Sequence, residues 1–271
     1  MKTSNHLLRR LTAALLAAVL ALSIALPVFA SDNGDTIYIN SVSDLLSLAR
    51  NCAYDQWSVG KTVILQKDLS LEGMLWEPIP SFSGQFKGSG HTISDLTITG
   101  QYSPAGLFGI VEEQGSIESL SVRGVVSVSD SADTTTGGIV GINHGTLISC
   151  QFTGVVTGDS EVGGIVGRNE SEGTIDHSTA RAIVTGKSST GGIAGYNLGA
   201  ITGCTNVGSI NTEYPEASLD TDGFTAKMVD YINNKMAAAA DDATNSVTNV
   251  ATDTGGIAGR SSGMILTSVN T

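Results

Sequence analysis

Two carboxylates in the Gly-rich half of the chain are the first candidates for chemistry. Cleavage of a glycosidic bond needs two carboxylates about 5–9 Å apart on one face. Glu118 and Asp176 occupy the same position of a repeated segment, but two repeats apart, which is about 9.6 Å if the repeats stack as neighbouring strands. Ser149 and Gly203 are expected at the Asp176 position of the intervening and following repeats. We keep a carbohydrate-active site on the Glu118 and Asp176 side of the repeats as an alternative hypothesis. Because the two carboxylates are not in adjacent repeats, we predict no catalytic residue.

The histidines and the remaining acidic clusters give no metal or cofactor motif. A zinc protease needs two His residues one helical turn apart beside a Glu, and the four His residues are scattered: His6, His91, His144 and His177. Asp130 and Asp133 could contribute to a calcium site, although a solvated acidic loop is the favoured interpretation. We therefore predict no cofactor and no bound metal.

Three cysteines are expected to be buried and free. Cys150 and Cys204 fall at equivalent repeat positions but two repeats apart, beyond the ~7 Å between Cα atoms that a disulfide tolerates. Cys52 lies in a different segment. Free cysteines of this kind behave as small apolar side chains.

Residues 1–30 have the pattern of a secretory signal peptide. Lys2, Arg9 and Arg10 precede an apolar run, Leu11–Leu26, which is shorter than the ~20 residues of a membrane-spanning helix. Cleavage is expected after Ala30, so the protein is expected to be secreted or at the cell surface. The net charge of −12 disfavours nucleic acid as a partner, and no membrane insertion is expected after cleavage.

A Gly-rich core recurs five times and explains the 33 glycines among 271 residues. Each copy reads small-Gly-apolar-apolar-Gly, for example Gly163-Gly164-Ile165-Val166-Gly167. A second apolar residue follows each core at a constant position, such as Leu147, Ile175 or Ile201. We assign a structural role to two glycines of each core: Gly106, Gly109, Gly138, Gly141, Gly164, Gly167, Gly192, Gly195, Gly256 and Gly259.

These repeats predict an all-β fold, a parallel β-helix or β-solenoid. Each copy is expected to form three short strands, too short for helices and rich in β-formers. Stacking the copies places the apolar positions in ladders along one narrow core. The glycines are expected either where the chain turns with positive φ or where neighbouring coils approach closely. An antiparallel propeller would need longer periods and more aromatic residues.

The repeats also suggest the domain organisation. Residues 31–100 are expected to form an N-terminal cap and irregular first coils, with a cap helix near 41–52 that begins at a Ser or Asp. Repeat coils follow over 101–211, and a last, incomplete coil over 255–271 suggests that the sequence is the front of a longer protein. The insertion at 212–254 is predicted to contain an amphipathic helix from Phe224 to Asp242.

The repeated core, together with the segment from Phe86 through Gly90 to Ile98, resembles GLUG-motif proteins. The opening of the chain strengthens the resemblance through Asp44-Leu45, Asp68-Leu69 and Trp76-Glu77-Pro78-Ile79. The resemblance implies a bacterial exported or surface-attached module. Such repeats occur in adhesin-like proteins and in the non-catalytic N-terminal part of IgA-specific metallopeptidases.

We therefore expect a surface module that acts as an adhesin-like binding domain or a stalk, without catalysis of its own. The expected partner is a host or matrix protein or a glycan, and the solenoid ends could mediate self-association. Two alternatives stay open: a carbohydrate-active β-helix enzyme, and the non-catalytic front of a larger surface metallopeptidase.

Overall fold

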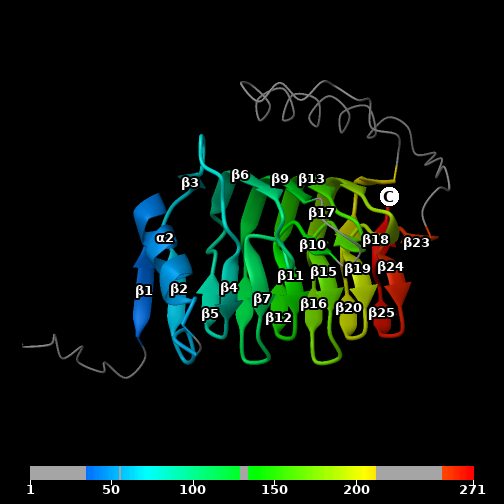
Figure 1. Cartoon of the computed structure of the whole chain (residues 1–271). Helices are drawn as coiled ribbons and strands as arrows, with labels where there is room; N and C mark the ends of the chain where they lie inside the picture. Colours follow the sequence, from blue (N-terminus) through cyan, green and yellow to red (C-terminus); the bar gives the residue numbers. More distant parts are fainter. Residues whose placement is uncertain (1–34, 55, 129–133, 212–251) are drawn as a thin grey trace, which may run out of the picture. The chain divides into compact units, whose positions relative to one another are not determined.

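Short parallel strands wind into a solenoid in the computed structural model (Figure 1), which describes residues 35–54, 56–128, 134–211 and 252–271. The chain divides into two units, Met1–Gly34 and Asp35–Thr271, and the description below concerns the second. The predicted leader, the Asp130/Asp133 loop and the predicted helix 224–242 lie outside the described residues. The parallel solenoid predicted from the repeats is confirmed.

One coil contains four strands, where the sequence suggested three. The third coil consists of β14 (Glu161–Gly163), β15 (Val166–Asn169), β16 (Thr174–Asp176) and β17 (Thr179–Thr185). Gly164 and Ile165 form the corner between β14 and β15. The Gly-rich core is therefore a corner flanked by two strands, and this division of the core accounts for the fourth strand.

Equivalent strands of successive coils pair into four parallel sheets. Sheet A is β1 (Thr36–Ile39), β2 (Thr62–Leu65), β5 (Gln85–Lys87), β8 (Ser116–Glu118), β12 (Thr146–Ile148), β16, β20 (Ala200–Thr202) and β25 (Met264–Leu266). Sheet B is β3 (Leu69–Ser70), β6 (Thr92–Gly100), β9 (Ser121–Val128), β13 (Gln151–Thr157), β17, β21 (Thr205–Asn206) and β26 (Val269–Asn270), and β22 (Ser209–Ile210) also pairs with β17. Sheet C is β4 (Ile79–Phe82), β7 (Phe108–Val111), β11 (Val140–Asn143), β15, β19 (Ala194–Asn197) and β24 (Ala258–Ser261). Sheet D is β10 (Thr135–Gly137), β14, β18 (Ser188–Gly191) and β23 (Thr252–Gly255).

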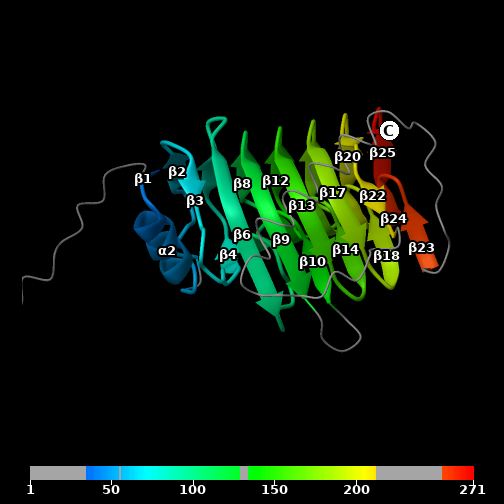
Figure 2. The same ribbon diagram turned by 90° about the horizontal axis from the view of Figure 1, so that it is seen from above.

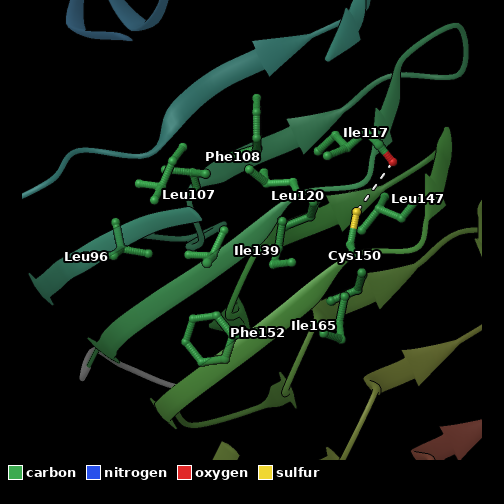
Figure 3. Packing of buried hydrophobic residues seen from close by; sticks show 14 of the residues in the cluster. Leu96, Leu107, Phe108, Ile117, Leu120, Ile139, Leu147, Cys150, Phe152 and Ile165 are labelled. Carbon is green, nitrogen blue, oxygen red and sulfur yellow. Dashed lines mark hydrogen bonds between the residues drawn. The ribbon is translucent and has the colours of Figure 1, made fainter. Parts of the chain in front are cut away.

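The core is a set of apolar ladders that run from coil to coil. In sheet A the inward ladder joins Val63, Phe86, Ile117, Leu147, Ile175 and Ile201, all fully buried. Figure 3 shows how Ile117 and Leu147 of this ladder pack with Phe108, Ile139 and Ile165 from the facing side of the coil. Because no single coil encloses a core, burial of these side chains depends on its neighbours.

The helix α2 (Val42–Asn51) lies against β1 and β4 at one end of the solenoid (Figure 2). Ser41 is its N-cap, since the Ser41 Oγ accepts from the Asp44 backbone N–H at 3.2 Å, and Arg50 lies in the last turn. Leu45 and Leu48 are buried in the core. The helix predicted from the sequence is thus confirmed, and it covers apolar side chains of the first coils. No helix within the described residues is long and apolar enough to cross a membrane.

Candidate functional site

The structure keeps the two candidate carboxylates apart. Glu118 and Asp176 do occupy the same outward position of sheet A, and Ile148 lies between them. The flanking residues predicted for Asp176 are wrong by one position: Ile148 and Thr202 pair with Asp176, whereas Ser149 and Gly203 lie beside His177. The ladder of Leu147, Ile175 and Ile201 fixes this register, because the residue that follows each of them lies in one row with Asp176.

His177 is the nearest titratable neighbour of Asp176. Its Nδ1 lies 2.8 Å from the Asp176 Oδ1, and the imidazole is exposed. His91 and Asp68 form a second such contact at 3.1 Å in an earlier coil. Among the described residues, no three His, Cys, Asp or Glu side chains come together as metal ligands would. Within the part of the chain that the structure describes, the exposed His177 and the half-buried Asp176 therefore form a pair without a second carboxylate.

The three cysteines are free and buried. The Cys150 thiol donates to the carbonyl oxygens of Ile148 and Ile117, at 3.4 and 3.5 Å (Figure 3). Burial raises the pKa of the Cys150 thiol to about 12 and those of Cys52 and Cys204 to about 11. A thiol is nucleophilic only when ionised, so the geometry argues against a catalytic cysteine here.

The repeat-core glycines lie where coils approach each other. None of them has a positive φ within the described chain, so of the two expected reasons for glycine only close approach applies to these positions. A Cβ added to Gly164 would come well inside 3.0 Å of the Gly192 carbonyl oxygen, and one added to Gly106 would lie 2.9 Å from the Ile139 oxygen. Similar approaches to a neighbouring coil, below 3.0 Å, occur at Gly138, Gly141, Gly167, Gly192 and Gly195, whereas the atoms nearest to Gly256 belong to Asn270 of its own coil.

Positive φ is found instead at the corner between sheets A and B. Ser119, Ser149, His177, Gly203 and Thr267 hold this position with φ between 45° and 61°. Only Gly203 is a residue type that adopts the left-handed region without strain.

A ladder of buried asparagines runs along the inner face of sheet C. Asn143 Nδ2 donates to Asn169 Oδ1 at 2.8 Å, and Asn169 Nδ2 donates to Asn197 Oδ1 at 2.8 Å. Each amide also donates to a carbonyl of its own corner, such as Gly145 or Gly173. The ladder was not predicted, although Asn recurs in the sequence two residues after the last glycine of three cores.

A groove of about 810 Å³ lies between α2 with its following turn and the segment that enters β4. Its walls include Arg50, Asn51, Tyr54, Leu75, Glu77 and Pro80. Tyr54 and Leu75 are 73% and 74% exposed, which makes them the most exposed large apolar residues of the described chain. The volume falls within the range of small-molecule sites.

Fixed side chains support this groove. The Trp76 indole is buried and donates to the Leu107 carbonyl at 3.1 Å, so it anchors one wall to the solenoid. Arg50 donates through Nε to the Leu46 carbonyl at 3.3 Å and through Nη2 to the Ser47 Oγ at 3.2 Å. The guanidinium is thus oriented before any ligand arrives. The repeat pattern could not reveal the groove, because neither wall belongs to a repeat.

The wall formed by β4 is unsuited to pairing with an added strand. β4 is the last strand of sheet C on this side, and edge strands ordinarily offer N–H groups to a partner. Pro80 lies within β4 and has no N–H, and Pro78 precedes the strand. An added strand could therefore not form a complete ladder of hydrogen bonds with β4.

An outward row on sheet C carries a second set of polar and aromatic side chains. Arg168, Tyr196 and Arg260 follow one another in register, and each guanidinium lies 5.3 Å from the centre of the Tyr196 ring. Arg168 is also bonded to Glu161 at 2.6 Å. Both guanidinium groups pack against the Tyr196 ring, so this ring is less available to a ligand. The groove is therefore the better candidate for a binding site.

The family comparison agrees with the repeat assignment. The GLUG motif matches residues 158–185, which span the third coil. Halomucin of Haloquadratum walsbyi is 30% identical in an alignment of 155 residues that covers 52% of this chain. A protein of Evansella cellulosilytica described as a Gly-rich membrane protein is 28% identical in an alignment of 137 residues that covers 36% of this chain. An immunoglobulin A1 protease-like protein of Bacteroides ovatus, with a solved structure, superposes with a TM-score of 0.44 at 16% identity, over 65% of this chain and 67% of its own.

The match spans only 2% of the length of Halomucin and 16% of that of the Gly-rich membrane protein. The chain therefore spans a small part of the length of both curated relatives.

Proposed function

Since the chain carries GLUG-type repeats, we propose that it is an exported or surface module that binds a ligand without catalysing a reaction. The groove between α2 and the segment before β4 carries this proposal: exposed Tyr54 and Leu75 stand beside the oriented Arg50 on a rigid scaffold. The names of the two relatives, a mucin and a membrane protein, support an extracellular location. The signal-peptide pattern of residues 1–30 supports the same location.

The ligand class that suits the groove is an uncharged saccharide. A sugar ring can stack its C–H face on an aromatic side chain while its hydroxyls bond with polar groups nearby. Tyr54 and Leu75 offer the apolar surface, and Arg50, Asn51 and Glu77 offer donors and acceptors. Arg50 and Glu77 contribute one charge of each sign, so neither an anionic nor a cationic ligand is favoured.

Binding of the purified chain to a panel of neutral and charged oligosaccharides tests the proposal. Tyr54→Ala should weaken binding of a neutral ligand by about tenfold or more, the equivalent of one lost aromatic contact. Tyr38→Ala is the matched control, because Tyr38 is also exposed, at 54%, but lies on β1 away from the groove. Equal effects of the two variants, or binding to none of the saccharides, would reject the groove as the site.

Two other functions have specific tests. A carbohydrate-active enzyme using the Asp176 side predicts glycan cleavage that disappears in Asp176→Asn. If the chain is the non-catalytic front of a surface metallopeptidase, the same reading frame should encode a His-Glu-x-x-His motif. A stalk role is compatible with both of these functions and is favoured by the unbroken stacking of sheet A over eight strands.

A further inference from the structure

The outward face of sheet B carries an apolar row that is buried although it points away from the core. Val125, Val155 and Ile183 stand in register on β9, β13 and β17, which lie side by side in Figure 2. Each is followed by a valine of the core cluster, so the row itself faces the other way. The three side chains do not belong to that cluster, yet they are only 3%, 5% and 7% exposed. Burial of outward apolar side chains indicates that a further layer covers this face.

The face around the row is basic and rich in hydroxyls. β9, β13 and β17 contain Arg123 and Arg181 and no acidic residue, in a chain whose net charge is −12. Both arginines are exposed, and each stands two residues before a member of the row, on the same side of the sheet. Thr153 lies between them in register, and neither guanidinium forms an ion pair within the described part of the chain. A segment that covers this face should therefore be apolar along its centre and acidic beside it.

One segment of the chain leaves and returns at the edge of this face. Residues 212–251, which lie outside the described part, connect β22 with β23. β22 pairs with β17, where Ser209 stands opposite Ile183. The Asn211 Nδ2 donates to the Thr254 Oγ1 at 3.0 Å, so the two ends of the segment are held together close to the apolar row.

The sequence of this segment complements the face. Apolar residues recur every four positions at Phe224, Met228, Ile232 and Met236, which is the pattern of one side of a helix. Residues 212–251 contain seven acidic residues and two lysines, so the segment has the opposite charge to the face. The row crosses two strand spacings, about 9.6 Å, whereas a helix over 224–242 would be about 28 Å long. The segment is therefore long enough to cover the whole row.

We infer that the outward row of sheet B is the docking site of residues 212–251, with the apolar side of the 224–242 segment on the row and acidic residues beside the two arginines. A helix packed on one face of a sheet is a common way to bury an apolar sheet surface. This inference is independent of the ligand proposed for the groove. It assigns the insertion to the solenoid itself, so the covered face is not the one that meets a partner.

Alkylation of a cysteine placed in the row tests this docking. Val155→Cys introduces a thiol at the middle of the row, and the three native thiols react slowly because they are buried and have raised pKa values. A maleimide should label Val155→Cys about tenfold faster or more when the apolar side of the segment is removed. This background combines Phe224→Ser, Met228→Ser, Ile232→Ser and Met236→Ser. The matched control, with four changes on the other side of the expected helix, should leave the rate unchanged: Lys227→Ser, Asp230→Ser, Asn234→Ser and Ala238→Ser.

Ile148→Cys supplies the reference rate, because Ile148 stands on the outward face of sheet A. Its labelling should be the same in all three backgrounds. Arg123→Glu combined with Arg181→Glu should also speed the labelling of Val155→Cys, whereas Arg123→Lys with Arg181→Lys should not.

Three results would overturn the inference. Equal labelling of Val155→Cys in the three backgrounds would mean that the segment does not cover the row. Equal acceleration at Ile148→Cys would mean that burial of the row depends on the whole coil. Labelling of Val155→Cys that slows as the protein concentration rises would mean that a second copy covers the row.

Discussion

The amide of Asn169 sits between two others, accepting from Asn143 and donating to Asn197, with both distances 2.8 Å. Because all three side chains are fully buried, none of these groups can exchange its partner for water. The distance between these three successive coils is therefore restrained by the length of the hydrogen bonds between their asparagines.

Asn169→Val should reduce the free energy of unfolding by about 2–3 kcal/mol, since it leaves buried amide and carbonyl groups on both sides without partners. Valine fits the position sterically, because Val111 occupies it in an earlier coil. Asn143→Val is the control at the end of the ladder and should cost less, because Asn143 has only one asparagine neighbour. Urea unfolding followed by circular dichroism measures both, and equal losses would contradict a cooperative ladder.

Gly164→Ala should destabilise the chain by about 2–3 kcal/mol, because the added methyl meets the Gly192 carbonyl and can be accommodated only if two coils separate. Gly109→Ala is a graded comparison. The nearest atom to its new Cβ, the Pro80 carbonyl oxygen, is 3.2 Å away, so the cost should be about 1 kcal/mol or less. If the two glycines tolerate alanine equally, close approach is not the reason for glycine in the repeat.

Ser149→Gly should stabilise the protein by about 0.5–1 kcal/mol, since Ser149 has a φ of 53° and Gly203 already holds the equivalent corner in the next coil but one. The backbone bond from Ser149 N–H to the Asp176 carbonyl does not involve the side chain and is retained. Ser127→Gly, in the strand β9, should instead destabilise by about 0.5–1 kcal/mol. Thermal melts of the two variants should shift in opposite directions, and a lower midpoint for Ser149→Gly would contradict the prediction.

Alkaline pH should weaken the fold through its buried thiols. Below pH 9 the thiols are protonated in both the folded and the unfolded chain. Above pH 9 the thiols of the unfolded chain ionise, whereas the Cys150 thiol of the folded chain stays protonated up to its pKa of about 12. The raised pKa thus stabilises nothing at neutral pH, and at pH 10 it lowers the free energy of unfolding by about 1.4 kcal/mol for each such thiol.

Cys150→Ser tests this pH dependence, because Ser178 holds the same ladder position in the next coil. Urea unfolding at pH 8 and pH 10 should show a loss of stability that is smaller in the variant by about 1.4 kcal/mol. Equal losses in the two proteins would mean that the Cys150 thiol ionises as readily in the folded chain as in the unfolded one.

The sequence predicted the features that depend on recurrence. Ile117, Leu147 and Ile175 stand at a constant distance from a glycine, so their stacking followed from the pattern alone. The helix near 41–52 was predictable because Ser41 and Arg50 mark its ends. Both features depend on neighbours close in sequence or on an exact repeat.

The remaining features depend on local backbone geometry or on non-repeated segments. A serine does not by its type predict the left-handed φ found at Ser149. The neighbour of Asp176 is Ile148, one residue before Ser149, and the constant spacing of Leu147 and Ile175 is enough to predict it. The groove was not predicted, because Tyr54 and Leu75 come together only through the packing of α2 on β4.

The dependence of each coil on its two neighbours has a consequence for how the molecule comes apart. A coil at an end has half the contacts of an interior coil, so local opening should begin there and advance one coil at a time. At the β1 end, α2 adds contacts with β1 and β4 that oppose this opening. The helix therefore protects the coils beside the groove from local unfolding.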